Sequence, residues 1–148
     1  MPNRIEIEIS WGDCDPAGIV FYPNYFAYFN RATDALFASI DLPLRKATER
    51  YGIVGWPMVD TRARFLKPSS FGDILRIETH VAELRRSSFT LCHRAFHADG
   101  ALAVEGHDIR VWTGSDGERL ASREIPAEVR ALLVGHQLQT VDFANIVN

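Results

Sequence analysis

Residues 13–25, DCDPAGIVFYPNY, combine residue types that could act on a carbonyl group. Two carboxylates, Asp13 and Asp15, precede a Pro-Ala-Gly bend, and a helical pattern opens at Pro23. The first N–H groups of a helix have no intrahelical partner and lie at the positive end of its dipole, so they can polarise a carbonyl oxygen. A nearby carboxylate could then serve as base or nucleophile. Turn formation or capping is the structural alternative for both aspartates.

A long helix is expected directly after this turn. Apolar positions recur at helical spacing until Asp41-Leu42-Pro43 ends the pattern, which predicts a helix of about five turns with one apolar stripe. The stripe consists of Phe26, Phe29, Thr33, Leu36, Phe37 and Ile40. Pro23 suits the first helical position, where an N–H group would have no intrahelical partner.

Most of the remaining chain has strand periodicity. Residues 4–10 alternate Ile with charged or polar residues, as in a half-buried strand. A short helical turn is expected at Leu44–Tyr51, ending at Gly52. Further strands are expected at Met58–Phe65, Ile74–Leu84, 89–97, 101–112 and, more briefly, 120–125, with hairpin signals at Asp99-Gly100 and Asp116-Gly117.

These elements indicate an α+β protein. A lone helix and a lone sheet each need an apolar partner, so the helix is expected to pack in the concave face of a curved, mostly antiparallel sheet. That arrangement is the hotdog fold. We expect one domain spanning residues 1–148, in which 129–133 could form a short helix and about 136–148 a C-terminal tail.

Composition excludes several classes of protein. The apolar share of 47% and charged share of 24% are those of a globular domain. A net charge of −3 gives no electrostatic basis for nucleic-acid binding. The sequence has neither a signal-peptide pattern nor a membrane-length apolar run, and Cys14 and Cys92 are too few for a disulfide framework. We therefore expect a cytoplasmic protein with no membrane partner.

Familiar catalytic and metal-binding signatures are missing from the sequence. No GxSxG, Walker or GxGxxG motif occurs. His93 and His97 have an HxxxH spacing, but in a strand that spacing spans about 13 Å, too far for one metal ion. The other three, His80, His107 and His136, are expected on strand faces or in the tail. We expect no metal and no organic cofactor.

The segment GDCDPAGIVFYPNY resembles the signature of the 4-hydroxybenzoyl-CoA thioesterase family of hotdog enzymes. Further similarity lies at YGIVGWPMV, LRRSSF and DIRVWTGSDGERL, so the resemblance covers roughly residues 5–126. It implies hydrolysis of an acyl-CoA thioester, with Asp15 as the catalytic carboxylate and the Tyr22 backbone N–H as the main donor to the carbonyl. Pro23, where broad-specificity relatives often have His, favours an aromatic acyl group. A homodimer or a dimer-of-dimers homotetramer is implied too.

The resemblance also suggests an acyl pocket. Asn30 stands where the family has an acidic residue that meets the phenol of the substrate. An amide can accept a hydrogen bond from a hydroxyl but also donates, so it should tolerate other ring substituents. Trp56 and Pro57 are candidates for the pocket wall, with simple core packing as the alternative.

Coenzyme A carries several phosphate charges, which an acidic chain must meet locally. Arg85, Arg86 and Ser87 lie in LRRSSF at an expected strand turn, and Arg119 follows the Asp116-Gly117 turn. Guanidinium groups suit phosphate oxygens, and the family resemblance favours CoA binding. The alternative is that these arginines are ordinary solvated residues.

Other functions remain as alternatives. A non-catalytic hotdog module could bind acyl-CoA, although burying Asp15 beside the carbonyl would then carry a desolvation cost without benefit. A broad-specificity aliphatic acyl-CoA thioesterase is a closer alternative. A hotdog dehydratase would need a paired His and acid, and the turn at 13–25 contains no histidine. Whether Asp15 attacks directly or activates water stays open.

Overall fold

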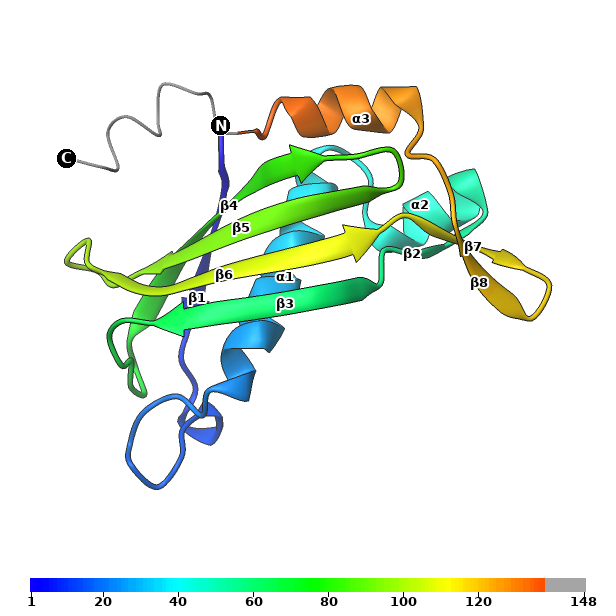
Figure 1. Cartoon of the computed structure of the whole chain (residues 1–148). Coiled ribbons are helices and arrows are strands. Elements are labelled where there is room, and N and C mark those ends of the chain that lie inside the picture. Colours follow the sequence, from blue (N-terminus) through cyan, green and yellow to red (C-terminus); the bar gives the residue numbers. More distant parts are fainter. Residues whose placement is uncertain (138–148) are drawn as a thin grey trace.

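The structure is a computed structural model that describes residues 1–137. A long helix crosses one face of a curved sheet, and two shorter helices lie toward one end of it (Figure 1). The helices are α1 (Pro23–Ser39), α2 (Leu44–Tyr51) and α3 (Ala127–Val134), with one 3₁₀ turn at Trp11–Asp13. The strands are β1 (Asn3–Glu8), β2 (Ile53–Gly55), β3 (Met58–Phe65), β4 (Ile74–Leu84), β5 (Ser88–Phe96), β6 (Leu102–Val111), β7 (Thr113–Asp116) and β8 (Arg119–Ser122).

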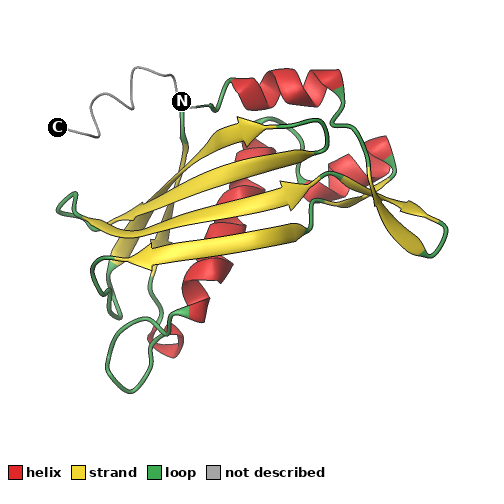
Figure 2. Ribbon diagram, in the orientation of Figure 1, coloured by secondary structure: helices red, strands yellow, loops and turns green. Residues whose placement is uncertain are grey.

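The main sheet has the strand order β1-β4-β5-β6-β3, and every neighbouring pair is antiparallel. Figure 2 shows α1 packed across one face of this sheet, with the opposite face uncovered by helix along most of its width. The expected hotdog arrangement is therefore confirmed.

Both ends of α1 have a local cause. Pro23 occupies the first turn, as expected. At the other end Asp41 adopts a left-handed conformation (φ 59°), and the N–H of Leu42 donates to the carbonyl of Phe37 at 2.9 Å. This is a Schellman motif, in which the last helical carbonyls find donors outside the helix.

The apolar face of α1 lies close to the sheet. Phe29 is 1% exposed, and its ring stacks on that of His93 in β5, with centroids 4.9 Å apart. Gly106 in β6 makes room for this ring, because a Cβ atom there would lie 2.5 Å from Phe29 Cε2. Farther along α1, Leu36 and Phe37 pack with Trp56 and Trp112 in a second part of the core.

The short elements differ from the sequence-based expectation. Strand β2 was not expected, and the predicted strand 101–112 is divided into β6 and β7. Strands β2, β7 and β8 form a separate three-stranded sheet. The expected strand 120–125 is β8, which begins and ends earlier. Both predicted hairpin turns are confirmed, with Gly100 (φ 88°) between β5 and β6 and Gly117 (φ 68°) between β7 and β8.

The start of the predicted tail packs against the chain. The carbonyl of His136 accepts a hydrogen bond from Val81 N–H at 2.9 Å, and His136 Nδ1 lies 2.8 Å from the carbonyl oxygen of Met1. The rest of that prediction, residues 138–148, lies outside the described residues. Within residues 1–137 no helix is both long and apolar enough to cross a membrane.

Candidate active site

Residues 13–21 fold back on themselves as a small hairpin before α1. Phe21 N–H donates to the carbonyl of Asp13 at 2.8 Å, and Asp15 N–H donates to that of Ile19 at 2.9 Å. The bend closes where Gly18, with φ 81°, donates to the carbonyl of Asp15 at 2.9 Å. Glycine adopts this positive φ without steric cost. The hairpin therefore carries Asp15 on one arm and delivers Tyr22 from the other.

Asp13 holds this hairpin against α1. Its Oδ2 atom accepts a hydrogen bond from the Tyr28 hydroxyl at 2.7 Å, and its backbone carbonyl accepts one from Asn24 Nδ2 at 2.8 Å. Burial and the hydrogen bond to Asp13 raise the pKa of the Tyr28 phenol, so this hydroxyl stays protonated as a donor. Asp13 thus has the structural role considered as an alternative for both aspartates.

The Asp15 carboxylate has a fixed orientation, but only one of its two oxygens accepts a hydrogen bond from the described residues. Its Oδ1 atom accepts the N–H of Ala17 at 2.8 Å, a local turn that fixes the carboxylate. Its Oδ2 atom accepts no hydrogen bond from residues 1–137. The carboxylate lines a pocket of about 410 Å³ beside Trp11 and Phe71, whose side chains are largely exposed. One oxygen of Asp15 is therefore free to act on a bound molecule.

Tyr22 supplies the free N–H group at the start of α1. Pro23 has no N–H, and the N–H groups of Asn24 and Tyr25 donate to the carbonyls of Phe21 and Tyr22, at 2.9 and 3.1 Å. Within the described chain the Tyr22 N–H has no acceptor. It is thus available at the positive end of the helix dipole, where it can polarise a carbonyl oxygen.

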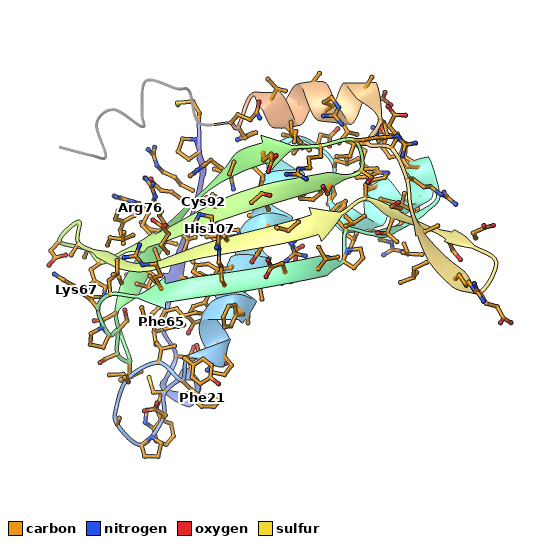
Figure 3. All side chains as sticks on the ribbon, in the orientation of Figure 1. Phe21, Phe65, Lys67, Arg76, Cys92 and His107 are labelled. Atoms are coloured by element: carbon orange, nitrogen blue, oxygen red, sulfur yellow. The ribbon has the colours of Figure 1, made fainter. Side chains whose placement is uncertain are left out.

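Aromatic side chains surround this N–H. The Tyr22 ring contacts those of Phe21 and Phe65, with centroids 5.6 and 6.3 Å apart. Figure 3 shows Phe21 beside the start of α1 and Phe65 at the end of β3 that faces it. Tyr22 and Phe65 border an apolar pocket of about 380 Å³ that Tyr25 and Lys67 also line. Within one chain, Asp15 and Tyr22 therefore line different pockets.

The three predicted acyl-pocket residues do come together. Asn30, Trp56 and Pro57 line one pocket of about 320 Å³. Trp56 is also a core residue, because it is 4% exposed and its ring stacks on Phe37 at a centroid distance of 3.9 Å. Trp56 therefore packs in the core and also lines the pocket, and its contact with an acyl group stays a prediction.

Two charged residues that line this pocket, Asp34 and Arg110, were not predicted from the sequence. Arg110 lies in β6 and is 5% exposed, with its Nη2 donating to Asn30 Oδ1 at 3.0 Å and its Nη1 donating to the Trp56 carbonyl at 3.3 Å. Asp34 follows Asn30 by one helical turn. The alternating pattern gave no signal for Arg110, since it makes Ile109 and Val111 the apolar positions, whereas in the structure Arg110 is the buried one.

Behind Arg110 a buried polar chain continues into the core. Asp108 Oδ2 lies 3.7 Å from Arg110 Nη2 and accepts a hydrogen bond from His93 Nε2 at 3.0 Å. His93 Nδ1 lies 2.8 Å from the Thr79 hydroxyl. Burial lowers the pKa of His93 despite the opposing effect of Asp108, so the imidazole is neutral. Burial alone would raise the pKa of Asp108, but His93, Thr61 and Arg110 together lower it.

The predicted CoA-binding residues lie elsewhere. Arg85 and Arg86 are exposed at the β4–β5 turn, where Arg85 Nε pairs with Glu83 at 2.9 Å. The carbonyl of Ser87 accepts a hydrogen bond from Trp112 N–H, and Arg119 begins the exposed strand β8. Figure 1 places the β7–β8 hairpin at the end of the molecule opposite the loop before α1. One chain therefore does not bring these arginines close to Asp15.

The described part of the chain, residues 1–137, contains no group of three His, Cys, Asp or Glu side chains placed to hold a metal ion.

Fold and sequence together define the class of protein. Residues 9–133 match the thioesterase-like superfamily, and the chain belongs to this family. The sequence is 41% identical over 133 residues to 4-hydroxybenzoyl-CoA thioesterase of Pseudomonas sp. strain CBS-3, covering 86% of this chain and 92% of that enzyme. It is 30% identical over 96 residues to 1,4-dihydroxy-2-naphthoyl-CoA hydrolase of Synechococcus elongatus, covering 65% of this chain and 71% of that one.

Solved structures agree with this assignment. The 4-hydroxybenzoyl-CoA thioesterase of Pseudomonas sp. strain CBS-3 superposes with a TM-score of 0.83 at 39% identity, covering 88% of this chain and 98% of that chain. An aspartate-to-asparagine mutant of a 4-hydroxybenzoyl-CoA thioesterase, complexed with 4-hydroxybenzoyl-CoA, gives 0.84 at 38% identity, covering 89% and 98%.

Proposed function

We propose that the protein is a thioester hydrolase that converts an aromatic acyl-CoA of the 4-hydroxybenzoyl-CoA kind to the free acid and CoA. The observation that carries this proposal is the presence of two groups without hydrogen-bond partners on one loop, which line separate pockets of a single chain. Asp15 keeps one carboxylate oxygen without a hydrogen-bond donor in the described chain, and Tyr22 presents an N–H without an acceptor. The similarity to an aromatic acyl-CoA thioesterase over most of both chains supports the choice of substrate.

In the proposed reaction the thioester oxygen accepts a hydrogen bond from Tyr22 N–H at the start of α1. The carbonyl carbon is then attacked, either by water that loses a proton to Asp15 or by Asp15 itself, which forms a mixed anhydride that water hydrolyses. The C–S bond breaks and CoA leaves as a thiolate. Because thiolate is a good leaving group, one carboxylate and one polarised oxygen can suffice without a metal or organic cofactor.

A complete site requires more than one copy of the chain in this proposal. From Tyr22 to Asn30 the helix advances about 12 Å, more than a benzoyl group can span. Edge strand β3 is largely exposed along its length, and Phe21, Tyr22 and Phe65 present 49%, 59% and 49% of their surface. Exposed apolar surface of this kind favours burial against a second copy. We therefore infer a homodimer, or a homotetramer built from dimers.

Coenzyme A recognition by Arg85, Arg86, Ser87 and Arg119 belongs to the same proposal. The guanidinium groups are exposed and so can reach phosphate oxygens, and Ser87 lies between them and β5. Arg119 is carried by the short β7–β8 hairpin at the same end of the molecule (Figure 1). We also infer a cytoplasmic location, since Cys14 and Cys92 are free thiols.

The test is a hydrolysis panel that measures release of free CoA thiol from aromatic and aliphatic acyl-CoA esters. We expect kcat/KM to be highest for benzoyl-type esters, and Asp15→Asn to abolish most of the turnover while retaining ester binding. Preference for aliphatic esters would instead identify a broad-specificity thioesterase. Binding without turnover in the native protein would identify an acyl-CoA-binding module.

A further inference from the structure

Asn30 has a fixed orientation in its pocket. Arginine has only hydrogen-bond donors, so the Asn30 atom 3.0 Å from Arg110 Nη2 must be the amide oxygen. Arg110 is itself held by the Trp56 carbonyl and by Asp108, so it does not turn away. The Asn30 amide nitrogen, which has no acceptor among residues 1–137, is the group left for a ligand. Asn30 can therefore donate to a bound acyl group, but its acceptor is already occupied.

Asp34 provides the acceptor that Asn30 lacks. Positions four apart on a helix lie on one face, and both side chains line the same pocket. The Asp34 carboxylate accepts no hydrogen bond from the described residues. Its pKa is raised by burial in the pocket wall, with the charge of Arg110 acting in the opposite direction. The pocket thus contains one free amide donor and one free carboxylate acceptor beside the indole of Trp56.

We propose that Asp34 is a specificity-determining residue, which together with Asn30 recognises a hydroxyl group on the acyl ring. The Asn30 Nδ2–H donates to the hydroxyl oxygen, and the hydroxyl proton is donated to Asp34. This inference rests on the proposed aroyl-CoA hydrolysis and names the substituent that the pocket selects.

The hydrogen-bonding capacity of the ring substituent predicts a ranking of substrates. A hydroxyl satisfies both groups, because it accepts one hydrogen bond and donates another. A methoxy group can accept from Asn30 but leaves Asp34 unpaired, and an unsubstituted ring leaves both unpaired. Discrimination is strong when a site's buried polar groups lose their partners. A ring carboxylate is excluded as well, since it would face the Asp34 carboxylate.

The test compares kcat/KM for benzoyl-CoA with that for its 3-hydroxy, 4-hydroxy and 4-methoxy derivatives. In Asp34→Ala we expect the preference for the better hydroxylated ester to fall about tenfold, because kcat/KM for that ester falls much more than kcat/KM for benzoyl-CoA. In Asp34→Asn, which keeps a weaker acceptor, the preference for the hydroxylated ester should fall by less. Glu49→Gln, an exposed acid on α2, is the matched control and should leave every ratio unchanged. Thermal unfolding confirms that each variant is folded.

A binding measurement tests the role of Asp34 without relying on turnover. Calorimetry on the Asp15→Asn protein should detect tighter binding of a hydroxylated aroyl-CoA than of benzoyl-CoA, and the added Asp34→Ala change should remove the difference. If aroyl esters are hydrolysed but Asp34→Ala leaves the hydroxyl preference intact, the role of Asp34 is refuted while the proposed function stands. If the native protein hydrolyses no aroyl-CoA, the proposed function is refuted and this inference falls with it.

Discussion

The hydroxyl of Tyr28 donates a 2.7 Å hydrogen bond to Asp13 Oδ2, whereas Asp15 Oδ2 receives none from residues 1–137. The two aspartates of one short loop therefore have different environments. Asp13 anchors the loop to the second turn of α1, and Asp15 has one carboxylate oxygen that accepts no hydrogen bond from the described residues. Substitutions at the two aspartates can therefore test turnover and stability separately.

Asp15→Asn should lower kcat at least about a hundredfold without changing the free energy of unfolding, because the amide keeps the shape of the carboxylate but is no base or nucleophile. Asp13→Ala and Tyr28→Phe should instead lower that free energy by about 1–3 kcal/mol through the lost hydrogen bond. Thiol release and urea unfolding measure the two effects. Near-normal turnover in folded Asp15→Asn would refute the assignment of Asp15.

Arg85→Ala, Arg86→Ala and Arg119→Ala should each raise KM for acyl-CoA more than they lower kcat, because phosphate contacts are remote from the reacting carbon. Added salt should have the same effect in the native protein. Arg45→Ala on α2, whose side chain is 93% exposed, is the matched control. An unchanged KM at low ionic strength would make the three arginines ordinary surface residues.

The free energy of unfolding should fall as the pH is lowered below about 6.5, which is the ordinary pKa of histidine. Burial lowers the pKa of His80 to about 4, and burial also lowers that of His93. Below pH 6.5 the unfolded chain therefore binds more protons than the folded one, which destabilises the fold. Urea unfolding between pH 8 and pH 5 measures this slope. His80→Gln should flatten it, and an unchanged slope would show that His80 titrates normally.

Gly106→Ala should lower the free energy of unfolding by about 1–3 kcal/mol, because the new methyl group meets the buried ring of Phe29. Gly12→Ala is the control, since a Cβ there meets no atom within 4 Å. Adding Phe29→Leu to Gly106→Ala should recover part of the loss. If Gly106→Ala were as stable as the native protein, α1 could move away from β6 without cost.

The part of the fold that could be predicted from the sequence is the part whose elements are long enough to show a hydrophobic period. Helix α1 and strands β3 to β6 are long enough for their periods to be read, and Asp-Gly pairs marked two hairpins. Strands β2 and β7 have only three and four residues, too few to define a period.

The candidate site could be predicted only where its residues are close together in the sequence. The loop with Asp15 and the helix start at Tyr22 are contiguous. The hydrogen bond of Arg110 to Asn30 joins residues 80 positions apart, so it depends on how α1 packs on β6. No local pattern could have identified which end of the Asn30 amide is free.

Helix α1 begins at the loop that contains Asp15 and continues without a break past Asn30 and Asp34. Under the proposed function, one continuous helix carries at its start the group that would polarise the carbonyl, and on later turns the groups that would face the acyl ring. Reactivity and selectivity would then depend on separate turns of a single element. Substitutions at positions 30 and 34 should in that case change the accepted acyl group without disturbing the start of the helix.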